Sequence, residues 1–123
     1  MTNEIKFNEM VADLAKPGAD IIASLTPEGA HTLHMAVGIS GEAGELLDAV
    51  KKYVIYNKPI DRVNVVEELG DLEFYMEGIR QGLGITREET IEANIYKLAK
   101  GPKARYKGGK YSDQAAQNRA DKQ

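Results

Sequence analysis

The chain has no cysteine, no tryptophan and no long apolar run among its 123 residues. The absence of cysteine excludes disulfides, thiolate nucleophiles, zinc-finger sites and iron–sulfur ligation. Because no apolar run approaches about 18 residues and none follows a basic N-terminus, we expect no membrane span, no secretory signal peptide and a cytoplasmic protein. The length suits one domain that needs no disulfide or metal to fold, since chains of this size bury about two-thirds of their unfolded surface.

Signals for β-strands are also scarce. No stretch of about 4–8 residues combines apolar–polar alternation with enrichment in β-branched residues, and no Asn-Gly or Asp-Gly pair separates such stretches. Apolar residues recur instead at helical spacing, interrupted by prolines and glycines. The pattern predicts helical segments at residues 5–14, 21–25, 32–56, 61–81 and 86–100. We expect residues 26–29 to break the chain before the long segment, and Asp61 and Thr86 to cap the two helices that follow it.

Large aliphatic side chains are missing from the C-terminal end. From Ala99 onward there is no Val, Ile, Leu, Met or Phe, so this end cannot build a core of its own. Residues 1–96 hold 8 basic and 17 acidic side chains (net −9), whereas residues 97–123 hold 8 basic and 2 acidic ones (net +6). This split indicates either separate sites for a cation and an anion or an acidic domain with a solvated basic tail. We predict an all-α bundle of four to five helices in residues 1–100, and a basic irregular C-terminal arm of the same domain in residues 101–123.

Two pairs of acidic residues lie at helical spacing in the two longest segments. At about 100° per residue, Glu42 and Glu45 share one stripe at the edge of the apolar face. Glu68 and Asp71 hold the same position in the next helix. The first stripe also carries His34, Gly38, Ala49 and Lys52, and the second carries Asn64 and Tyr75. Helices joined by a short loop are usually antiparallel neighbours, so we expect the two acid pairs to face one another.

Facing carboxylates favour a metal site over ordinary surface charge. Four of them at low dielectric repel, and a divalent cation relieves both the repulsion and the cost of burial. Oxygen ligands without cysteine favour Mg²⁺, or Mn²⁺ in its place, over zinc. The alternative is that the acids lie on solvated faces or pair with Lys and Arg. A di-iron carboxylate bundle needs two Glu-x-x-His motifs, and neither His31 nor His34 follows a Glu by three residues.

The motifs around these acids resemble those of the MazG-like nucleotide pyrophosphohydrolases, which belong to the all-α NTP pyrophosphatases. That family is marked by E-x-x-E followed some twenty residues later by E-x-x-D. Here 22 residues separate Glu45 from Glu68, within the runs GEAGELLD (41–48) and EELGD (67–71). The runs LHMAVG (33–38), DLEFY (71–75), NIYKL (94–98) and RYKGGKYS (105–112) extend the resemblance over roughly residues 30–119. The last two runs lie further apart than is usual in the family, so we expect the helix to end earlier and the arm to begin sooner.

The resemblance implies an enzyme that hydrolyses nucleoside triphosphates, with deoxynucleotides expected, to the monophosphate and pyrophosphate. It implies that Glu42, Glu45, Glu68 and Asp71 hold Mg²⁺, which bridges phosphate oxygens and lowers the pKa of a water that attacks the α-phosphorus. Glu45 is the preferred general base, although the residues themselves do not decide which acid has this role.

Binding the triphosphate requires cations as well. The candidates for phosphate binding are Lys52, Lys97, Arg105 and Lys110, with Asn94 for a phosphate, the sugar or a metal-bound water. His34 lies two turns before Glu42, toward the base or sugar, and Tyr75 either stacks on the base or packs with its hydroxyl in the site. Ordinary surface charge is the alternative for Lys52 and Lys97, and a core position is the alternative for His34.

Three further hypotheses remain open from the sequence. The same fold and acid pairs serve dimeric dUTPases and phosphoribosyl-ATP pyrophosphatase, and a non-catalytic helical regulatory or interaction protein is a third class. The net −9 of residues 1–96 argues against nucleic acid as a partner. Val54, Ile55 and Phe74 lie off the main core stripe, and the family builds its bundle from two subunits, so we expect a homodimer or a homotetramer formed as a dimer of dimers.

Overall fold

The computed structural model describes residues 4–123, and every regular element in this part of the chain is helical. The all-α prediction is therefore confirmed. The elements are α1 (Phe7–Leu14), α2 (Gly18–Ser24), α3 (Pro27–Val54), α4 (Arg62–Leu83), α5 (Arg87–Ile95), a π-helical turn (Tyr96–Lys100), α6 (Asp113–Asn118) and a 3-10 turn (Ala120–Lys122). Within residues 4–123, no helix is both long and apolar enough to cross a bilayer.

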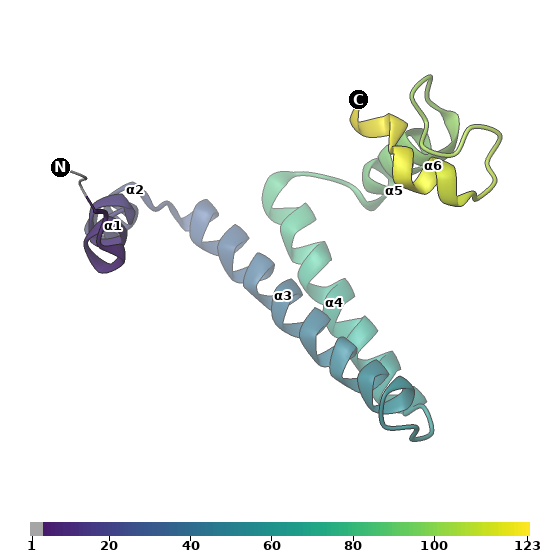
Figure 1. The fold of residues 1–123 in the computed structure, drawn as a ribbon, viewed down its shortest axis with the longest axis horizontal. Helices are drawn as coiled ribbons and strands as arrows, with labels where there is room; N and C mark the ends of the chain where they lie inside the picture. Colours follow the sequence, from purple (N-terminus) through teal and green to yellow (C-terminus); the bar gives the residue numbers. More distant parts are fainter. Residues whose placement is uncertain (1–3) are drawn as a thin grey trace.

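The antiparallel hairpin of α3 and α4 is the centre of the fold (Figure 1). At 28 residues, α3 is about 42 Å long, and α4 returns beside it after the loop at residues 55–61. Asp61 caps α4 as predicted, because its Oδ1 accepts a hydrogen bond from the backbone N–H of Asn64 at 3.0 Å. The expected pairing of the two longest helices is thus present.

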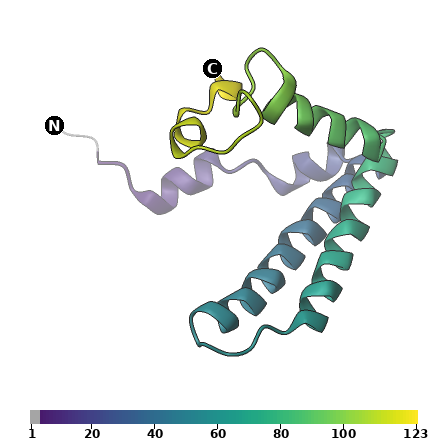
Figure 2. The same cartoon turned by 90° about the vertical axis from the view of Figure 1, so that its right-hand side faces the viewer.

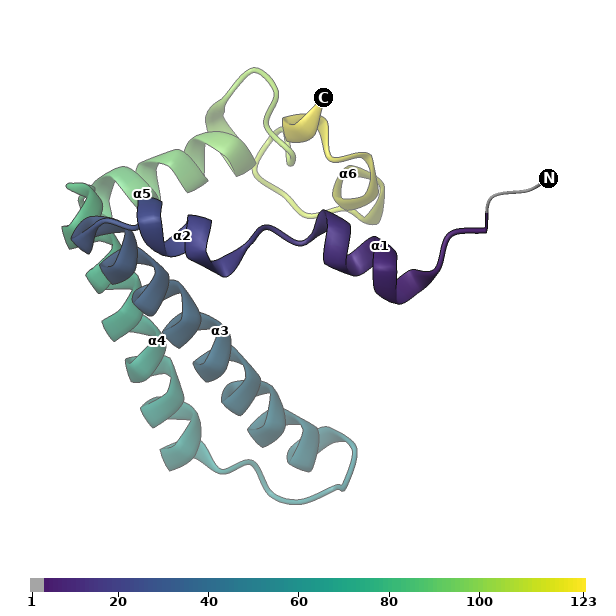
Figure 3. The same ribbon diagram turned by 90° about the vertical axis from the view of Figure 1, so that its left-hand side faces the viewer.

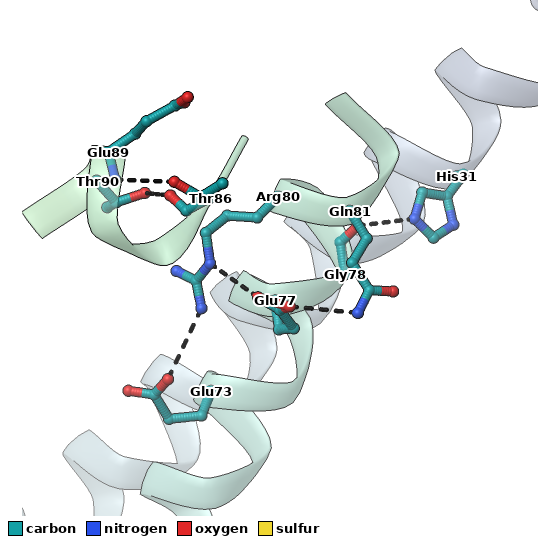
Figure 4. Close-up of polar contacts among 9 residues, drawn as sticks. All are labelled: His31, Glu73, Glu77, Gly78, Arg80, Gln81, Thr86, Glu89 and Thr90. Atoms are coloured by element: carbon teal, nitrogen blue, oxygen red, sulfur yellow. Dashed lines mark hydrogen bonds and ion pairs between the residues drawn. The ribbon is translucent and has the colours of Figure 1, made fainter. Parts of the chain in front are cut away.

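Glycines let the two helices of the hairpin approach closely. A Cβ on Gly78 would lie 2.2 Å from the sulfur of Met35, and one on Gly82 would lie 2.7 Å from the ring of His31. His31 Nε2 also donates a hydrogen bond to the Gly78 carbonyl at 2.9 Å (Figure 4). Nearer the middle, a Cβ on Gly38 would lie 2.3 Å from the ring of Tyr75. At each of these three positions, a Cβ would force the facing side chain to move.

The start of α3 differs from the prediction. Residues 26–29 were expected to break the chain, but α3 begins at Pro27, five residues before the predicted start at Thr32. Thr26 is its N-cap, and the threonine Oγ1 accepts a hydrogen bond from the N–H of Gly29 at 3.0 Å. Proline suits the first helical position because its φ is already helical and its missing N–H would have no partner there. The same residues that end one helix therefore begin the next.

Helix α5 follows its predicted start and ends in an unusual turn. Thr86 Oγ1 accepts a hydrogen bond from the N–H of Glu89 at 3.0 Å, which confirms the predicted cap. Helix α4 ends at Leu83, two residues later than expected, where Gly84 adopts a left-handed φ of 68°. Residues 96–100 continue α5 as a π-helical turn, and Gly101 ends it as predicted.

The C-terminal arm folds against that turn. The N–H groups of Arg105 and Tyr106 donate to the carbonyls of Lys97 and Leu98 at 3.0 and 2.9 Å. Arg105 also forms two hydrogen bonds with Asp121, at 2.8 and 3.1 Å. The arm, expected to be irregular, contains α6 and the 3-10 turn besides its loops. It lies beyond the end of α4, away from the hairpin loop (Figures 1 and 2).

A single chain leaves most of its apolar side chains exposed. Helices α1 and α2 extend away from the hairpin (Figures 1 and 3), and neither contains a buried residue. Among the described residues, the buried apolar side chains are Met35, Ala49 and Ala104. The accessible surface is 10083 Å², compared with about 6,500 Å² for a compact monomer of 13.5 kDa. The helices of one chain therefore do not close into a bundle.

Candidate metal centre

Acidic side chains from α3 and α4 meet across the hairpin, in the half nearer the loop. Glu42 of α3 and Glu68 and Asp71 of α4 each offer one carboxylate oxygen, and these oxygens lie within 4.8 Å of one another. We call these three residues the acid cluster. Because α3 and α4 are antiparallel, stripes at spacing i, i+3 on each helix come to face one another. The structure thus brings together three of the four acids that the sequence pattern placed on facing stripes.

Burial makes this cluster different from surface charge. Glu68 is only 8% exposed, and the Oε2 atoms of Glu42 and Glu68 are both buried without a hydrogen-bond partner. The pKa of Glu68 is raised to about 7, most by hydrogen bonding with the Glu42 carboxyl, then by burial, and then by Glu45. Without a cation, the neighbouring carboxyls and burial therefore disfavour the ionised form of Glu68.

No basic side chain neutralises the cluster within the described part of the chain. The ion pairs there join Lys52 to Asp48, Arg80 to Glu73 and Glu77, and Arg105 to Asp121. None of them involves Glu42, Glu45, Glu68 or Asp71. The ion-paired alternative for these acids is therefore not what residues 4–123 adopt.

The donor set fits a hard divalent cation. It consists of carboxylate oxygens with neither sulfur nor imidazole, the ligand type that Mg²⁺ and Mn²⁺ prefer. A cation would also give the two buried orphan oxygens a partner. Glu45 lies outside the cluster but close enough to raise the pKa of Glu68, and its own side chain is exposed to water. The fourth acid thus borders the site on its solvent side.

His34 and Tyr75 lie together on the side of the cluster away from the loop. Their ring centroids are 6.3 Å apart with an interplanar angle of 62°, and Tyr75 packs on Gly38 one turn before Glu42. Phe74 contacts Tyr75 edge-on at 5.2 Å. His34 is exposed and Tyr75 half-buried, so the two rings border the site and leave one side of His34 open.

Lys52 lies on the other side of the cluster, toward the loop. Its Nζ is 3.1 Å from Asp48, one turn back on α3, and both side chains are more than half exposed. It also lines a pocket between the end of α3, the loop and the start of α4. Lys52 thus lies on α3 two turns beyond Glu45, on the loop side of the acid cluster.

The other predicted substrate residues lie elsewhere in a single chain. Asn94 and Lys97 are exposed on α5 and the π-helical turn, and Lys110 belongs to the arm. These elements lie beyond the end of the hairpin opposite to its loop (Figures 1 and 2). One chain therefore does not bring them to its own acid cluster.

Arg105 already has a partner. Its guanidinium binds Asp121, whose side chain is only 2% exposed, and this pairing lowers the pKa of Asp121 to about 2 and raises that of Arg105. The chain turns at Gly101, and the N–H of Arg105 bonds back to the carbonyl of Lys97. In this chain, Arg105 holds the arm together.

Two basic residues were missed by the sequence analysis. Arg80 is 8% exposed, and its guanidinium is 3.0 Å from Glu77 and 4.0 Å from Glu73 (Figure 4). Its hydrogen bond to Glu77, together with one from Gln81, lowers the pKa of Glu77. The sequence does contain a signal for these ion pairs, because Glu77 and Glu73 lie three and seven residues before Arg80, on the same face of the helix. Lys58, in the loop, had no such signal, because its position depends on how the loop folds.

No protein-family model, curated protein or solved structure matched this chain in the comparisons with known proteins. The site is therefore interpreted from its own residues and geometry.

Proposed function

We propose that this protein is a Mg²⁺-dependent nucleoside triphosphate pyrophosphohydrolase of the MazG-like kind. The observation that carries the proposal is the acid cluster, in which two buried carboxylate oxygens have neither a hydrogen-bond donor nor a basic partner. Structural ion pairs elsewhere in the chain are satisfied internally, so this unbalanced negative charge is suited to a cation brought from solution. The motif resemblance supports a nucleotide as the substrate, with deoxynucleoside triphosphates expected.

The residues of the site would have separate roles in the reaction. Glu42, Glu68 and Asp71 would hold the cation, and the cation would favour the ionised form of Glu68, whose pKa is raised without it. When bound, Mg²⁺ supplies charge neutralisation for the phosphates and activation of water. Water attacks the α-phosphorus, the bond from that phosphorus to the bridging oxygen breaks, and pyrophosphate leaves with the electron pair. Glu45, exposed beside the cluster, would accept the proton from the attacking water.

Pyrophosphate release from a panel of NTPs and dNTPs, dUTP included, with and without Mg²⁺ tests this function. We expect metal-dependent release that Glu45→Gln lowers by about 10²–10⁴-fold, as is typical for loss of a general base. Glu67→Gln, which removes an exposed acid next to Glu68, is the matched control and should retain activity. Release from no member of the panel, or equal activity in Glu45→Gln, would overturn the proposal.

We also propose that the active form is a homodimer or a dimer of dimers. One chain exposes about 3,500 Å² more surface than a compact fold of its mass. Obligate interfaces bury about 2,000–5,000 Å² summed over both partners, or about 1,000–2,500 Å² per chain, so one such interface would cover part of this excess and two would cover it. Apolar side chains at the end of α3, Leu47, Val50, Val54 and Ile55, line a pocket of about 390 Å³ that a second copy would cover. Light scattering after size exclusion should give two or four times 13.5 kDa, and a monomer at micromolar concentration would contradict the proposal.

A further inference from the structure

A cavity lies on the loop side of the acid cluster. It has a volume of about 270 Å³ and is lined by Ala49, Lys52, Lys58, Pro59, Asp61 and Asn64. We call it the loop pocket. Ala49 follows Glu45 by one helical turn, and Asn64 precedes Glu68 by one turn. The pocket therefore adjoins the site of the acids along the same face of the hairpin.

The backbone of the loop places Lys58 in this pocket. Its N–H donates to the carbonyl of Lys52 at 3.2 Å, across the turn that follows α3. Asn57 adopts a left-handed φ of 54°. The φ of Pro59 is fixed by its ring, and a proline favours extended backbone at the residue before it, here Lys58. These three features hold the end of α3 and the loop in register, so that two lysines come from different segments to one cavity.

The charges in the loop pocket favour an anion. Within the described residues, Lys58 forms no ion pair, and Lys52 pairs with Asp48 at an exposed site, where such pairs are weak. The acid in the lining is Asp61, and its Oδ1 is engaged in capping α4 through the N–H of Asn64. Two lysines and an asparagine therefore line a space whose one acidic lining residue already accepts a hydrogen bond.

We propose that the loop pocket binds the terminal phosphates of the substrate and, after cleavage, pyrophosphate, with Lys58 and Lys52 as the ligands. This inference rests on the proposed function. It adds Lys58 to the site and gives the orientation of the substrate along the hairpin. At about 270 Å³, the pocket is smaller than the 300–1,000 Å³ typical of sites for whole ligands, so it suits part of a nucleotide. The α-phosphate then lies at the acids and the nucleoside extends toward His34 and Tyr75. The substrate runs along the hairpin with its phosphates toward the loop.

Direct binding of pyrophosphate tests the pocket without relying on turnover. Isothermal titration of the full-length protein with pyrophosphate, in buffer containing Mg²⁺, should show binding that weakens about tenfold in Lys58→Ala, from loss of one charge-assisted contact. Lys52→Ala should weaken it as well, and Lys58→Arg should retain most of it because the charge stays in the pocket. Lys51→Ala is the control, since Lys51 is next to Lys52 but its Nζ lies over the ring of Tyr56.

The outcomes separate this inference from the proposed function. If pyrophosphate does not bind, or binds to Lys58→Ala and Lys51→Ala as it does to wild type, the loop pocket is not a phosphate site, whether or not the protein hydrolyses nucleotides. If binding depends on Lys58 but no nucleotide is hydrolysed, the pocket stands and the proposed reaction fails. Far-UV circular dichroism of each variant identifies any that lose the fold, and Lys58→Arg then decides the result.

Discussion

Helix α4 buries two charged side chains to the same extent, and the surroundings of the two differ completely. Glu68 and Arg80 are each 8% exposed and lie twelve residues apart on this helix. Arg80 is bound by Glu77 and approached by Glu73, whereas Glu68 faces Glu42 and has an oxygen without a partner. A buried charge without a partner is costly, whereas partners offset much of that cost. The half of the hairpin near Arg80 thus satisfies its buried charge within the chain, and the half near Glu68 does not.

Packing follows the same division. Away from the loop, Met35 and His31 fit against Gly78 and Gly82 with no room for a Cβ. Near the acid cluster, Gly41, Gly44 and Gly70 have open space around them. Close approach of the helices thus marks one half, and facing carboxylates mark the other. Substitutions placed in each half of the hairpin can therefore test this contrast.

Removing the unpartnered charge should abolish most of the activity. Glu68→Gln keeps the size of the side chain but removes one of the acids that would hold the cation. We expect kcat/KM for pyrophosphate release to fall by about 10²–10³-fold, the range typical when one electrostatic contact to a transition state is lost. Steady-state kinetics at saturating Mg²⁺ measures the fall, and Arg80→Gln should lose far less. Similar losses in both variants would mean that the two halves are not functionally distinct.

The tightly packed half should not tolerate one added methyl group. Gly78→Ala places a Cβ where the Met35 sulfur now lies, and overpacking of this kind costs about 1–3 kcal/mol. Gly70→Ala, in the same helix but in open space, should be neutral or stabilising by up to about 1 kcal/mol. Urea unfolding of both variants gives the comparison. Equal effects at the two positions would show that α3 and α4 do not interlock at Gly78.

The features of the hairpin that could be predicted from the sequence are those set by interactions between residues close together in the chain. The facing acids followed from helical spacing, because Glu42, Glu68 and Asp71 need only two regular helices joined by a short loop. The cap of Asp61 followed from local chemistry as well. Thr26 and Pro27 were misread because the same residues can end one helix or begin another. Which of the two they do depends on the helix-forming residues on their C-terminal side.

Other features depend on contacts that no local pattern encodes. Arg105 was expected to bind phosphate, but its partner Asp121 lies sixteen residues away and meets it only after the arm has folded. The glycine contacts required knowing which face of α4 meets α3, and Lys58 required the path of the loop. The π-helical turn at residues 96–100 has no sequence signal that we recognise.

Substitutions of the two buried charges should change stability in opposite directions. In metal-free buffer at pH 8, Glu68→Gln removes a repulsive buried carboxylate and should raise Tm, because it relieves the repulsion and desolvation that raise the pKa of Glu68. Arg80→Gln removes the partner of Glu77 and should lower Tm. Differential scanning fluorimetry without and with Mg²⁺ measures both shifts. The gain in Glu68→Gln should disappear with Mg²⁺, since only wild type then gains a bound cation.

The pH dependence of stability gives the finest test of the same contrast. The pKa of Glu68 is about 7 in the folded chain, above its ordinary value of 4.5, so the folded state binds more protons than the unfolded state between these values. The contribution of Glu68 to folding stability is therefore fully present below about pH 4.5 and is lost as the pH rises through about 7.

The difference in Tm between wild type and Glu68→Gln, measured at each pH, isolates this contribution, because His31 and His34 are present in both proteins. In metal-free buffer the difference should fall from pH 5 to pH 8, and with saturating Mg²⁺ it should rise, because the cation binds the ionised carboxylates that form as the pH rises. A difference that is flat with pH in both buffers would mean that Glu68 is ionised and solvated like an ordinary surface acid, and the division of the hairpin into two halves would fail at its central residue.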